Sequence, residues 1–243
     1  MNIFKILGVP VHSYTMREVV EELDNRIKKQ EQSFIVTANA EIIMSCQEDK
    51  EYYDIVKNAE IVLPDGAGAV WAGRHLGNHV PERVAGFDLY LELMKLAAAK
   101  GYKAYFFGSA PGVAESAKKV CEERYPGVQV VGVRNGYFKD NESADIVKEI
   151  NESGAQLLFA ALGAPKQEKW LAHNRGKLNP IILMGIGGSF DVLAGKMQRA
   201  PKWMQDASLE WLFRLYKQPS RFMRMMALPK FVIEVFLHGE KHI

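Results

Sequence analysis

The chain has 243 residues, 48% of them hydrophobic and 25% charged, with a formal net charge of +2. This composition supplies a full apolar core and excludes a disordered chain. The two cysteines, Cys46 and Cys121, belong to no CxxC or Cys/His cluster, which argues against a disulfide framework or structural zinc and favours a reducing cytosol. The N-terminal apolar run is too short for a signal peptide, and no stretch approaches the roughly 20 apolar residues of a membrane helix. We therefore expect a cytoplasmic protein that can lie on a membrane without spanning it.

Short β-rich runs alternate with longer helical patterns over the first 195 residues, which is typical of a parallel sheet covered by helices. The predicted strands are residues 4–9, 33–36, 61–63, 103–107, 128–133, 157–161 and 181–184. The predicted helices are residues 15–30, 40–57, 67–76, 87–100, 111–125, 142–152 and 166–175. Thr15 and Glu18 form a capping box at the first helix. The pattern predicts an α/β fold with a Rossmann-like, mainly parallel sheet flanked by helices.

The last fifty residues differ in character from the rest of the chain. Residues 196–243, here called the tail, carry nine Lys and Arg against four Asp and Glu, a net charge of +5. Residues 1–195, here called the body, have a net charge of −3. Trp, Phe and Met are interleaved among the tail cations, which indicates an anionic partner such as phosphate, nucleic acid or a lipid surface. We expect a catalytic α/β body and a basic, amphipathic helical appendage.

Polar or glycine-rich loops follow most of the predicted strands. In a parallel sheet these loops share one edge, and the ligand lies there. They contain Thr37 and Asn39, then Gly108, then Gly163, Lys166 and Gln167, then Gly187 and Asp191. Two of the loops lead straight into helices, whose N-termini suit a diphosphate. Glycine is also the ordinary residue of strand-to-helix turns, so it is the coincidence of the loops on one edge that favours a nucleotide-type ligand.

Asp65 follows the third predicted strand on a tight Pro64-Asp65-Gly66 turn. A carboxylate in this position is held rigidly beside the ligand edge and can serve as a general base. The alternative is that Asp65 caps the helix that begins near Ala67.

Two further patterns are weaker. Gly66, Gly68 and Gly73 imitate a dinucleotide-binding fingerprint, but the GxGxxG spacing is broken. His75 and His79 have the i,i+4 spacing of a metal pair, yet a glycine lies between them and no third ligand is evident, so surface histidines are favoured. No DxD sequence occurs. We expect neither a bound metal nor a cofactor.

An ordered set of motifs spans nearly the whole chain. In the body these are Thr37-Ala-Asn39, Pro64-Asp65-Gly66, Glu82-Arg83-Val-Ala-Gly86, Gly163-Ala-Pro165-Lys166-Gln167-Glu168 and Gly187-Gly188-Ser-Phe190-Asp191. In the tail they are Arg199-Ala-Pro201-Lys-Trp203, Leu209-Glu210-Trp211, Arg214-Leu215, Pro219, Arg221 and Arg224. This set resembles the motifs of the bacterial WecG/TagA/CpsF glycosyltransferases.

The resemblance implies an activity. Members with this pattern look like N-acetylmannosaminyltransferases, which transfer ManNAc from UDP-ManNAc to undecaprenyl-diphosphate-linked GlcNAc in the synthesis of the wall teichoic acid linkage unit. Related members use other sugars. The implied reaction is inverting and metal-independent, with Asp65 as the base. The implied substrate-binding residues are Thr37, Asn39, Arg83, Gly163, Lys166, Gln167, Glu168, Gly187 and Asp191, and the loop pattern adds Gly108. For Thr37, Asn39, Arg83 and Gln167 an ordinary role in turns and caps is the alternative.

The resemblance also gives the tail a role. Without a metal, Arg214, Arg221 and Arg224 are candidates to neutralise the diphosphate of the departing UDP or to meet the membrane. An amphipathic tail can dock on the anionic inner leaflet and bring the enzyme to its lipid acceptor. The alternative is that its apolar surface packs onto the body or a neighbouring subunit, so a homo-oligomer is among the expected partners.

Two other classes stay open on the sequence. A nicotinamide-dependent oxidoreductase explains the glycine loops but predicts a proper GxGxxG turn. A non-catalytic membrane or nucleic-acid adaptor explains the tail but leaves the polar residues of the ligand edge without a role. We expect no nucleic-acid partner.

Overall fold

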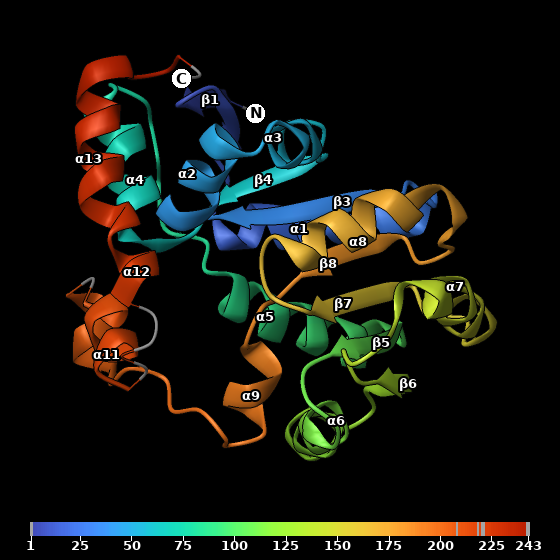
Figure 1. Ribbon diagram of the computed structural model, residues 1–243. Coiled ribbons are helices and arrows are strands. Elements are labelled where there is room, and N and C mark those ends of the chain that lie inside the picture. The colour runs from blue at the N-terminus through green and yellow to red at the C-terminus, as the bar shows by residue number, and fades with distance from the viewer. Residues whose placement is uncertain (1, 208, 218, 220–221, 242–243) are drawn as a thin grey trace.

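The computed structural model describes residues 2–207, 209–217, 219 and 222–241, without the side chains of Asp206, Arg214, Met223 and Arg224. Its centre is a six-stranded sheet in the order β4-β3-β8-β7-β5-β6 (Figure 1). The strands are β3 (Ser33–Ala38), β4 (Ile61–Pro64), β5 (Lys103–Gly108), β6 (Gln129–Arg134), β7 (Leu157–Ala161) and β8 (Ile182–Gly185). Every neighbouring pair is parallel. The predicted α/β fold with a parallel sheet is confirmed.

Helices cover both faces of this sheet, which is why its strands are nearly continuous apolar runs. Along β3, Phe34 and Val36 belong to one apolar layer and Ile35 to the other, because successive side chains of a strand point to opposite faces. The first layer includes side chains of α2 (Ala40–Glu48), α3 (Lys50–Lys57), α4 (Gly66–His75), α7 (Ser143–Glu152) and α8 (Lys166–Asn174). The second includes side chains of α1 (Met16–Lys29), α5 (Gly86–Lys100), α6 (Val113–Arg124) and α9 (Ser189–Leu193). Two short 3-10 helices, Asp140–Glu142 and Arg175–Lys177, complete the body.

The single strand predicted over residues 4–9 is wrong. The structure has an antiparallel hairpin of β1 (Ile3–Ile6) and β2 (Val9–His12), separate from the main sheet. Leu7 and Gly8 form its two-residue turn, with φ values of 47° and 78°. Left-handed backbone at both central positions is what such a turn requires to match the twist of its strands.

The single helix predicted over residues 40–57 is also wrong, because the chain breaks at Asp49. The extended backbone of Asp49 ends α2. Its side chain then caps α3 by accepting a hydrogen bond from the backbone N–H of Tyr52 at 3.0 Å. Asp49 therefore divides the predicted helix in two, because its preference for a cap position outweighs the continuous apolar pattern.

The tail contains α10 (Lys202–Asp206), α11 (Glu210–Lys217), α12 (Phe222–Met225) and α13 (Ala227–His238). Helix α13 packs against α2 and α4, and Phe231 and Val235 are buried there. Beyond the helix, the backbone carbonyls of Gly239 and Glu240 accept hydrogen bonds from Leu7 and Gly8 of the hairpin turn at 3.0 and 2.9 Å. The end of the tail is thus part of the packed structure, as the red helix beside the blue and green elements in Figure 1 shows.

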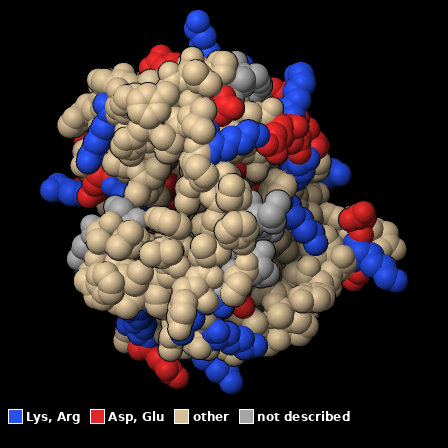
Figure 2. All heavy atoms as spheres, turned by 60° about the vertical axis from the view of Figure 1, so that its left-hand side comes forward, with Lys and Arg blue, Asp and Glu red and all other residues tan. Residues whose placement is uncertain are grey.

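Much of the remaining tail surface is apolar and exposed. Of the thirteen large hydrophobic side chains that are exposed in the described chain, ten lie in the tail. Tyr216, Leu237 and Trp203 are 79, 71 and 64% exposed. Figure 2 shows this face, largely tan, with both blue Lys and Arg and red Asp and Glu side chains near its borders. No helix within the described residues is long and apolar enough to cross a membrane.

Candidate active site

A cleft of about 830 Å³ opens at the carboxyl ends of β3, β4, β7 and β8. Parallel strands end at one edge, so loops far apart in sequence meet there. Six of the predicted site residues line it, namely Thr37, Asn39, Asp65, Gly163, Gln167 and Gly187. The tail supplies a second wall, which includes Arg199, Glu210, Met226 and Lys230. The cleft is therefore built jointly by the body and the tail.

Asp65 lies in this cleft at the end of β4. One carboxylate oxygen, Oδ2, accepts a hydrogen bond from the backbone N–H of Gly86 at 3.3 Å. The backbone N–H of Asp65 donates to the carbonyl of Ala38 at 3.0 Å, which ties the turn to the neighbouring strand β3. Asp65 occupies the N-cap position of α4, but its side chain makes no capping hydrogen bond in the described structure. Capping of α4 therefore does not account for this carboxylate, which accepts a hydrogen bond from the first residue of α5.

Two other polar side chains flank Asp65. A Cβ atom on Gly86 would lie 2.7 Å from Oγ1 of Thr37, so the close approach of these two segments requires glycine. Asn39 caps α2, with its Oδ1 accepting from the backbone N–H of Ile42 at 3.0 Å. The capping alternative is thus confirmed for the Asn39 oxygen, and the residue still lines the cleft.

Gln167 bridges two loops of the cleft. Its Oε1 accepts hydrogen bonds from the backbone N–H of Gly163, after β7, at 3.2 Å and from that of Gly187, after β8, at 3.0 Å. Its Nε2 donates to Oε1 of Glu168 at 2.7 Å. Glu168 is buried below Gln167 and does not line the cleft. Burial raises the pKa of the Glu168 carboxyl, an effect that its hydrogen bonds from Gln167 and Tyr52 oppose.

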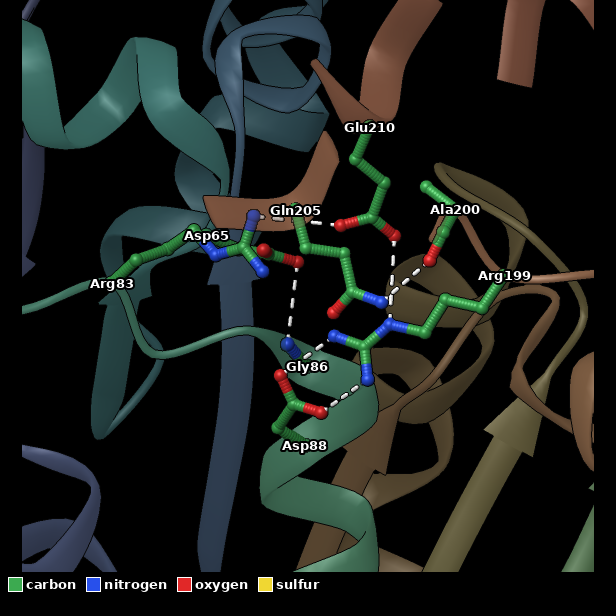
Figure 3. A network of polar contacts seen from close by, with 8 residues as sticks. All are labelled: Asp65, Arg83, Gly86, Asp88, Arg199, Ala200, Gln205 and Glu210. Carbon is green, nitrogen blue, oxygen red and sulfur yellow. Dashed lines mark hydrogen bonds and ion pairs between the residues drawn. The ribbon is translucent and has the colours of Figure 1, made fainter. Parts of the chain in front are cut away.

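A network of charged side chains joins the tail to the body beside Asp65 (Figure 3). Arg199 forms a two-pronged ion pair with Asp88, with Nη1–Oδ1 and Nη2–Oδ2 distances of 2.5 and 2.8 Å. Its guanidinium also lies over the ring of Phe87 at 4.9 Å. Glu210 lies between two arginines, 3.4 Å from Nη1 of Arg83 and 3.9 Å from Nε of Arg199. The tail thus contributes one cation, Arg199, and one anion, Glu210, to this wall of the cleft.

Burial disfavours the charged form of Arg199, but the hydrogen bonds and charge of Asp88, with the charges of Glu210 and Asp65, outweigh it and raise its pKa. The network contains three residues whose role the sequence did not predict, Asp88, Arg199 and Glu210. Arg199 and Glu210 belong to tail motifs, and this membership was the only sequence feature that pointed to a role for them. Nothing in the sequence pairs either of them with Asp88.

Several predicted site residues lie outside the cleft. Gly108 ends β5, where a Cβ would lie 2.4 Å from the carbonyl oxygen of Ala161. Asp191 accepts a hydrogen bond from Oγ of Ser109 at 3.1 Å. Lys166 is exposed and lies 4.6 Å from the ring centre of Phe138.

The tail arginines are placed only in part. Arg214 lies on α11 and Arg224 on α12, with side chains that are not described, and Arg221 lies outside the described residues. Their contacts with diphosphate or membrane stay predictions.

The weaker sequence patterns have structural explanations. A Cβ on Gly73 would lie 2.6 and 2.7 Å from side-chain atoms of Val80 and Phe4, so this glycine serves packing rather than a dinucleotide. His75 and His79 are exposed, and His75 stacks on Trp71 with ring centres 5.2 Å apart. Within the described residues no cluster of His, Cys, Asp and Glu could hold a metal ion.

Comparison with known proteins decides the family. The sequence profile of the Glycosyl transferase WecG/TagA/CpsF family matches residues 4–242. This protein belongs to that family. It is a glycosyltransferase, and the cleft with Asp65 is the candidate active site of a WecG/TagA/CpsF enzyme.

Relatives of this glycosyltransferase carry a specific name. A protein of Bacillus subtilis (strain 168) is 31% identical over 98% of this chain and 92% of its own length. One of Bacillus spizizenii is 36% identical over 85% of this chain and 79% of its own length. One of Staphylococcus aureus (strain MW2) is 31% identical over 95% of this chain and 91% of its own length. Each is named N-acetylglucosaminyldiphosphoundecaprenol N-acetyl-beta-D-mannosaminyltransferase.

Proposed function

We propose that this enzyme transfers N-acetylmannosamine from UDP-ManNAc to undecaprenyl-diphosphate-linked GlcNAc, as in the synthesis of the wall teichoic acid linkage unit. The names of the relatives support the acceptor and the transferred sugar. The observation that carries the proposal is the Asp65 carboxylate at the end of β4, inside a cleft shared by the body and the tail. A family member that uses another UDP-hexose for a capsule or exopolysaccharide intermediate is the second candidate.

In the proposed reaction an acceptor hydroxyl oxygen attacks the anomeric carbon of the sugar while the bond from that carbon to UDP breaks. Asp65 takes the hydroxyl proton as it is released, and UDP leaves with the bonding electron pair. One displacement inverts the anomeric centre, so a single base suffices. An ordinary carboxylate is too weak to deprotonate a sugar hydroxyl in advance, so accurate alignment supplies much of the rate enhancement. The backbone hydrogen bonds that fix the Asp65 turn serve this alignment.

The leaving diphosphate needs positive charge, and we assign it to arginines rather than to a metal. Arg199 lines the cleft and supplies positive charge there, although both of its Nη atoms pair with Asp88 and its Nε lies 3.9 Å from Glu210. Arg83 is held next to this region by Glu210. Arg214, Arg221 and Arg224 are further candidates from the tail. Guanidinium groups suit this task because they bind phosphate oxygens through two parallel hydrogen bonds.

The tail has a second proposed role, which is to dock the enzyme on the cytoplasmic face of the membrane. Its apolar exposed side chains support this proposal, since a soluble surface rarely gathers so many. The net charge of +5 on the tail favours an anionic leaflet. Docking would place the cleft, which the tail helps to build, beside the lipid-linked acceptor. Self-association through this surface stays a prediction.

Release of UDP from UDP-ManNAc tests the function directly. We would assay the full chain, with no added metal and with a chelator present, with and without a short-chain lipid-diphosphate-GlcNAc acceptor. Acceptor-dependent release is expected. Release that depends on an added divalent cation would contradict metal independence. Turnover with a different UDP-hexose and none with UDP-ManNAc would favour the second candidate.

A further inference from the structure

A series of buried, hydrogen-bonded polar groups lies directly beneath the cleft. The Tyr52 hydroxyl, on α3, donates to Oε2 of Glu168 at 3.2 Å. Oε1 of Glu168 accepts from Nε2 of Gln167 at 2.7 Å, and Oε1 of Gln167 accepts from the backbone N–H groups of Gly163 and Gly187. Glu168 is only 2% exposed and Tyr52 is fully buried. This series of hydrogen bonds extends from the apolar interior to the two glycine loops that line the active-site cleft.

The donors and acceptors in this series of hydrogen bonds allow only one orientation of the Gln167 amide. Oε1 of Glu168 accepts a hydrogen bond whether or not the carboxyl is protonated at its other oxygen, so the NH₂ end of the amide must face it. The carbonyl end then faces the two backbone N–H groups. A reversed amide would set donors against donors at both glycines. Gly185 makes room for this arrangement, since a Cβ there would lie 2.5 Å from Nε2 of Gln167.

The two backbone groups that Gln167 bridges belong to loops after different strands. Gly163 follows β7 and Gly187 follows β8, and both loops line the cleft. A single acceptor atom, Oε1 of Gln167, therefore sets the distance between two loops of the cleft. Burial of a carboxylate in such a place is unfavourable compared with an apolar side chain of similar size, so packing alone does not account for Glu168.

We propose that Glu168 is a positioning residue for sugar transfer, which orients the Gln167 amide so that the amide holds the Gly163 and Gly187 loops at the spacing the substrates require. This inference rests on the proposed function for its kinetic test. It assigns Glu168 an indirect role in place of direct contact with substrate. It also gives Gln167 the role of linking two loops of the cleft.

Two isosteric variants and one apolar variant test the proposal. Q167E removes the NH₂ end and sets two buried carboxylates against each other. In the double variant Q167E/E168Q the donor and acceptor exchange places, because the amide at position 168 donates to the carboxylate at 167 and accepts from Tyr52. The two glycine N–H groups keep an acceptor throughout. E168L removes the acceptor for the Gln167 amide altogether.

We expect the transfer rate at pH 8 to fall by about tenfold or more in Q167E and E168L, and to recover to within about threefold of the parent in Q167E/E168Q. E149Q is the matched control. Glu149 accepts a hydrogen bond from Tyr105 in a second tyrosine–glutamate pair, away from the cleft, and its loss should leave the rate unchanged. Melting temperatures measured in parallel separate unfolded variants from mispositioned ones.

The pH profile adds a second kinetic readout. In Q167E the adjacent carboxylates share a proton, and the like charges raise the pKa for its loss. Of the other titratable groups around them, the Tyr52 hydroxyl donates to Glu168 and opposes this effect, and the Cys46 thiol stays neutral because burial raises its pKa. Asp49 is paired with Lys169 at 2.8 Å. Q167E should therefore be most active at low pH and lose activity as the pH rises. The double variant, which holds one carboxylate, should not show this extra dependence.

Hydrogen exchange of the peptides that contain Gly163 and Gly187 provides a readout without substrate. Exchange should be faster in Q167E and E168L at pH 8 and restored in the double variant. If the parent enzyme fails to transfer ManNAc, the proposed function fails while this measurement still decides the positioning role. The positioning role is overturned if folded Q167E keeps the parent rate, or if the double variant matches Q167E in rate and exchange.

Discussion

The body and the tail build the same cleft by different means. In the body, Asp65 and Gln167 are fixed by hydrogen bonds to the backbone of neighbouring strands and loops. In the tail, Arg199 and Glu210 reach the cleft through ion pairs between side chains, to Asp88 and Arg83. Backbone hydrogen bonds within a packed sheet hold atoms more rigidly than partly exposed ion pairs, which salt weakens. Under the proposed function, the body would hold the reacting groups in place and the tail would complete the cleft.

This difference also appears in how each region buries apolar side chains. The strands of the body are covered on both faces, whereas the tail buries Met225, Phe231 and Val235 and leaves ten large hydrophobic side chains exposed among its described residues. Such a surface is consistent with a partner that is apolar and anionic at once. The following variants test each half of the comparison.

Asp65→Asn should have the largest effect, because it removes the proposed base from the rigid half of the site. We expect acceptor-dependent UDP release to fall by about 10²- to 10⁴-fold, with UDP binding retained in calorimetry. Asp191→Asn is the matched comparison, since Asp191 lies outside the cleft and contacts Ser109. If Asp65→Asn turned over normally and Asp191→Asn did not, Asp191 would be the base.

Phe231→Ala tests whether the tail is packed onto the body. Phe231 is fully buried against the body, so its truncation should lower the free energy of unfolding by about 3–5 kcal/mol. For a chain of this size that is a fall in melting temperature of roughly 6–20 °C. Phe236→Ala, on the same helix but 61% exposed, should cost less than about 1 kcal/mol. Equal melting temperatures for the two variants would show that α13 is not docked in solution.

Arg199→Gln tests the ion pair that joins the start of the tail to the body. Loss of its charged hydrogen bonds with Asp88 should destabilise that junction by about 1–3 kcal/mol and reduce transfer by roughly tenfold. Lys196→Gln makes the same change of charge at an exposed position nearby and should keep the parent rate. UDP release measured at low and high salt checks this prediction. If Arg199→Gln keeps the parent rate at both salt concentrations, the ion pair with Asp88 is not needed for transfer.

The smallest effect concerns the membrane. The double variant Ile233→Ser/Leu237→Ser removes two exposed apolar side chains of α13. We expect it to bind vesicles containing phosphatidylglycerol about tenfold more weakly in sedimentation. Tyr137→Ser removes an exposed side chain of the body and should not change vesicle binding. Equal binding to vesicles of phosphatidylcholine alone would argue against charge as part of the attraction.

Much of the site followed from the sequence because it depends on local pattern. Strand runs and the polar loops after them locate the sheet edge at which the cleft opens, so Thr37, Asn39, Asp65, Gly163, Gln167 and Gly187 were expected together and do line one cleft. The errors in the secondary structure were also local. A left-handed turn at Leu7 and Gly8 and a cap at Asp49 divided elements that apolar periodicity had joined.

The sequence by itself determined the parallel α/β sheet, the edge where the cleft lies and the contrast between an acidic body and a basic, apolar tail, because periodicity and composition carry these directly. Only the tertiary structure decided which side chains meet across large separations. It paired Arg199 with Asp88, set Glu210 beside Arg83, and buried Glu168 behind Gln167 rather than in the cleft. These contacts depend on how helices pack onto the sheet, and a one-dimensional pattern of residue types does not specify that geometry.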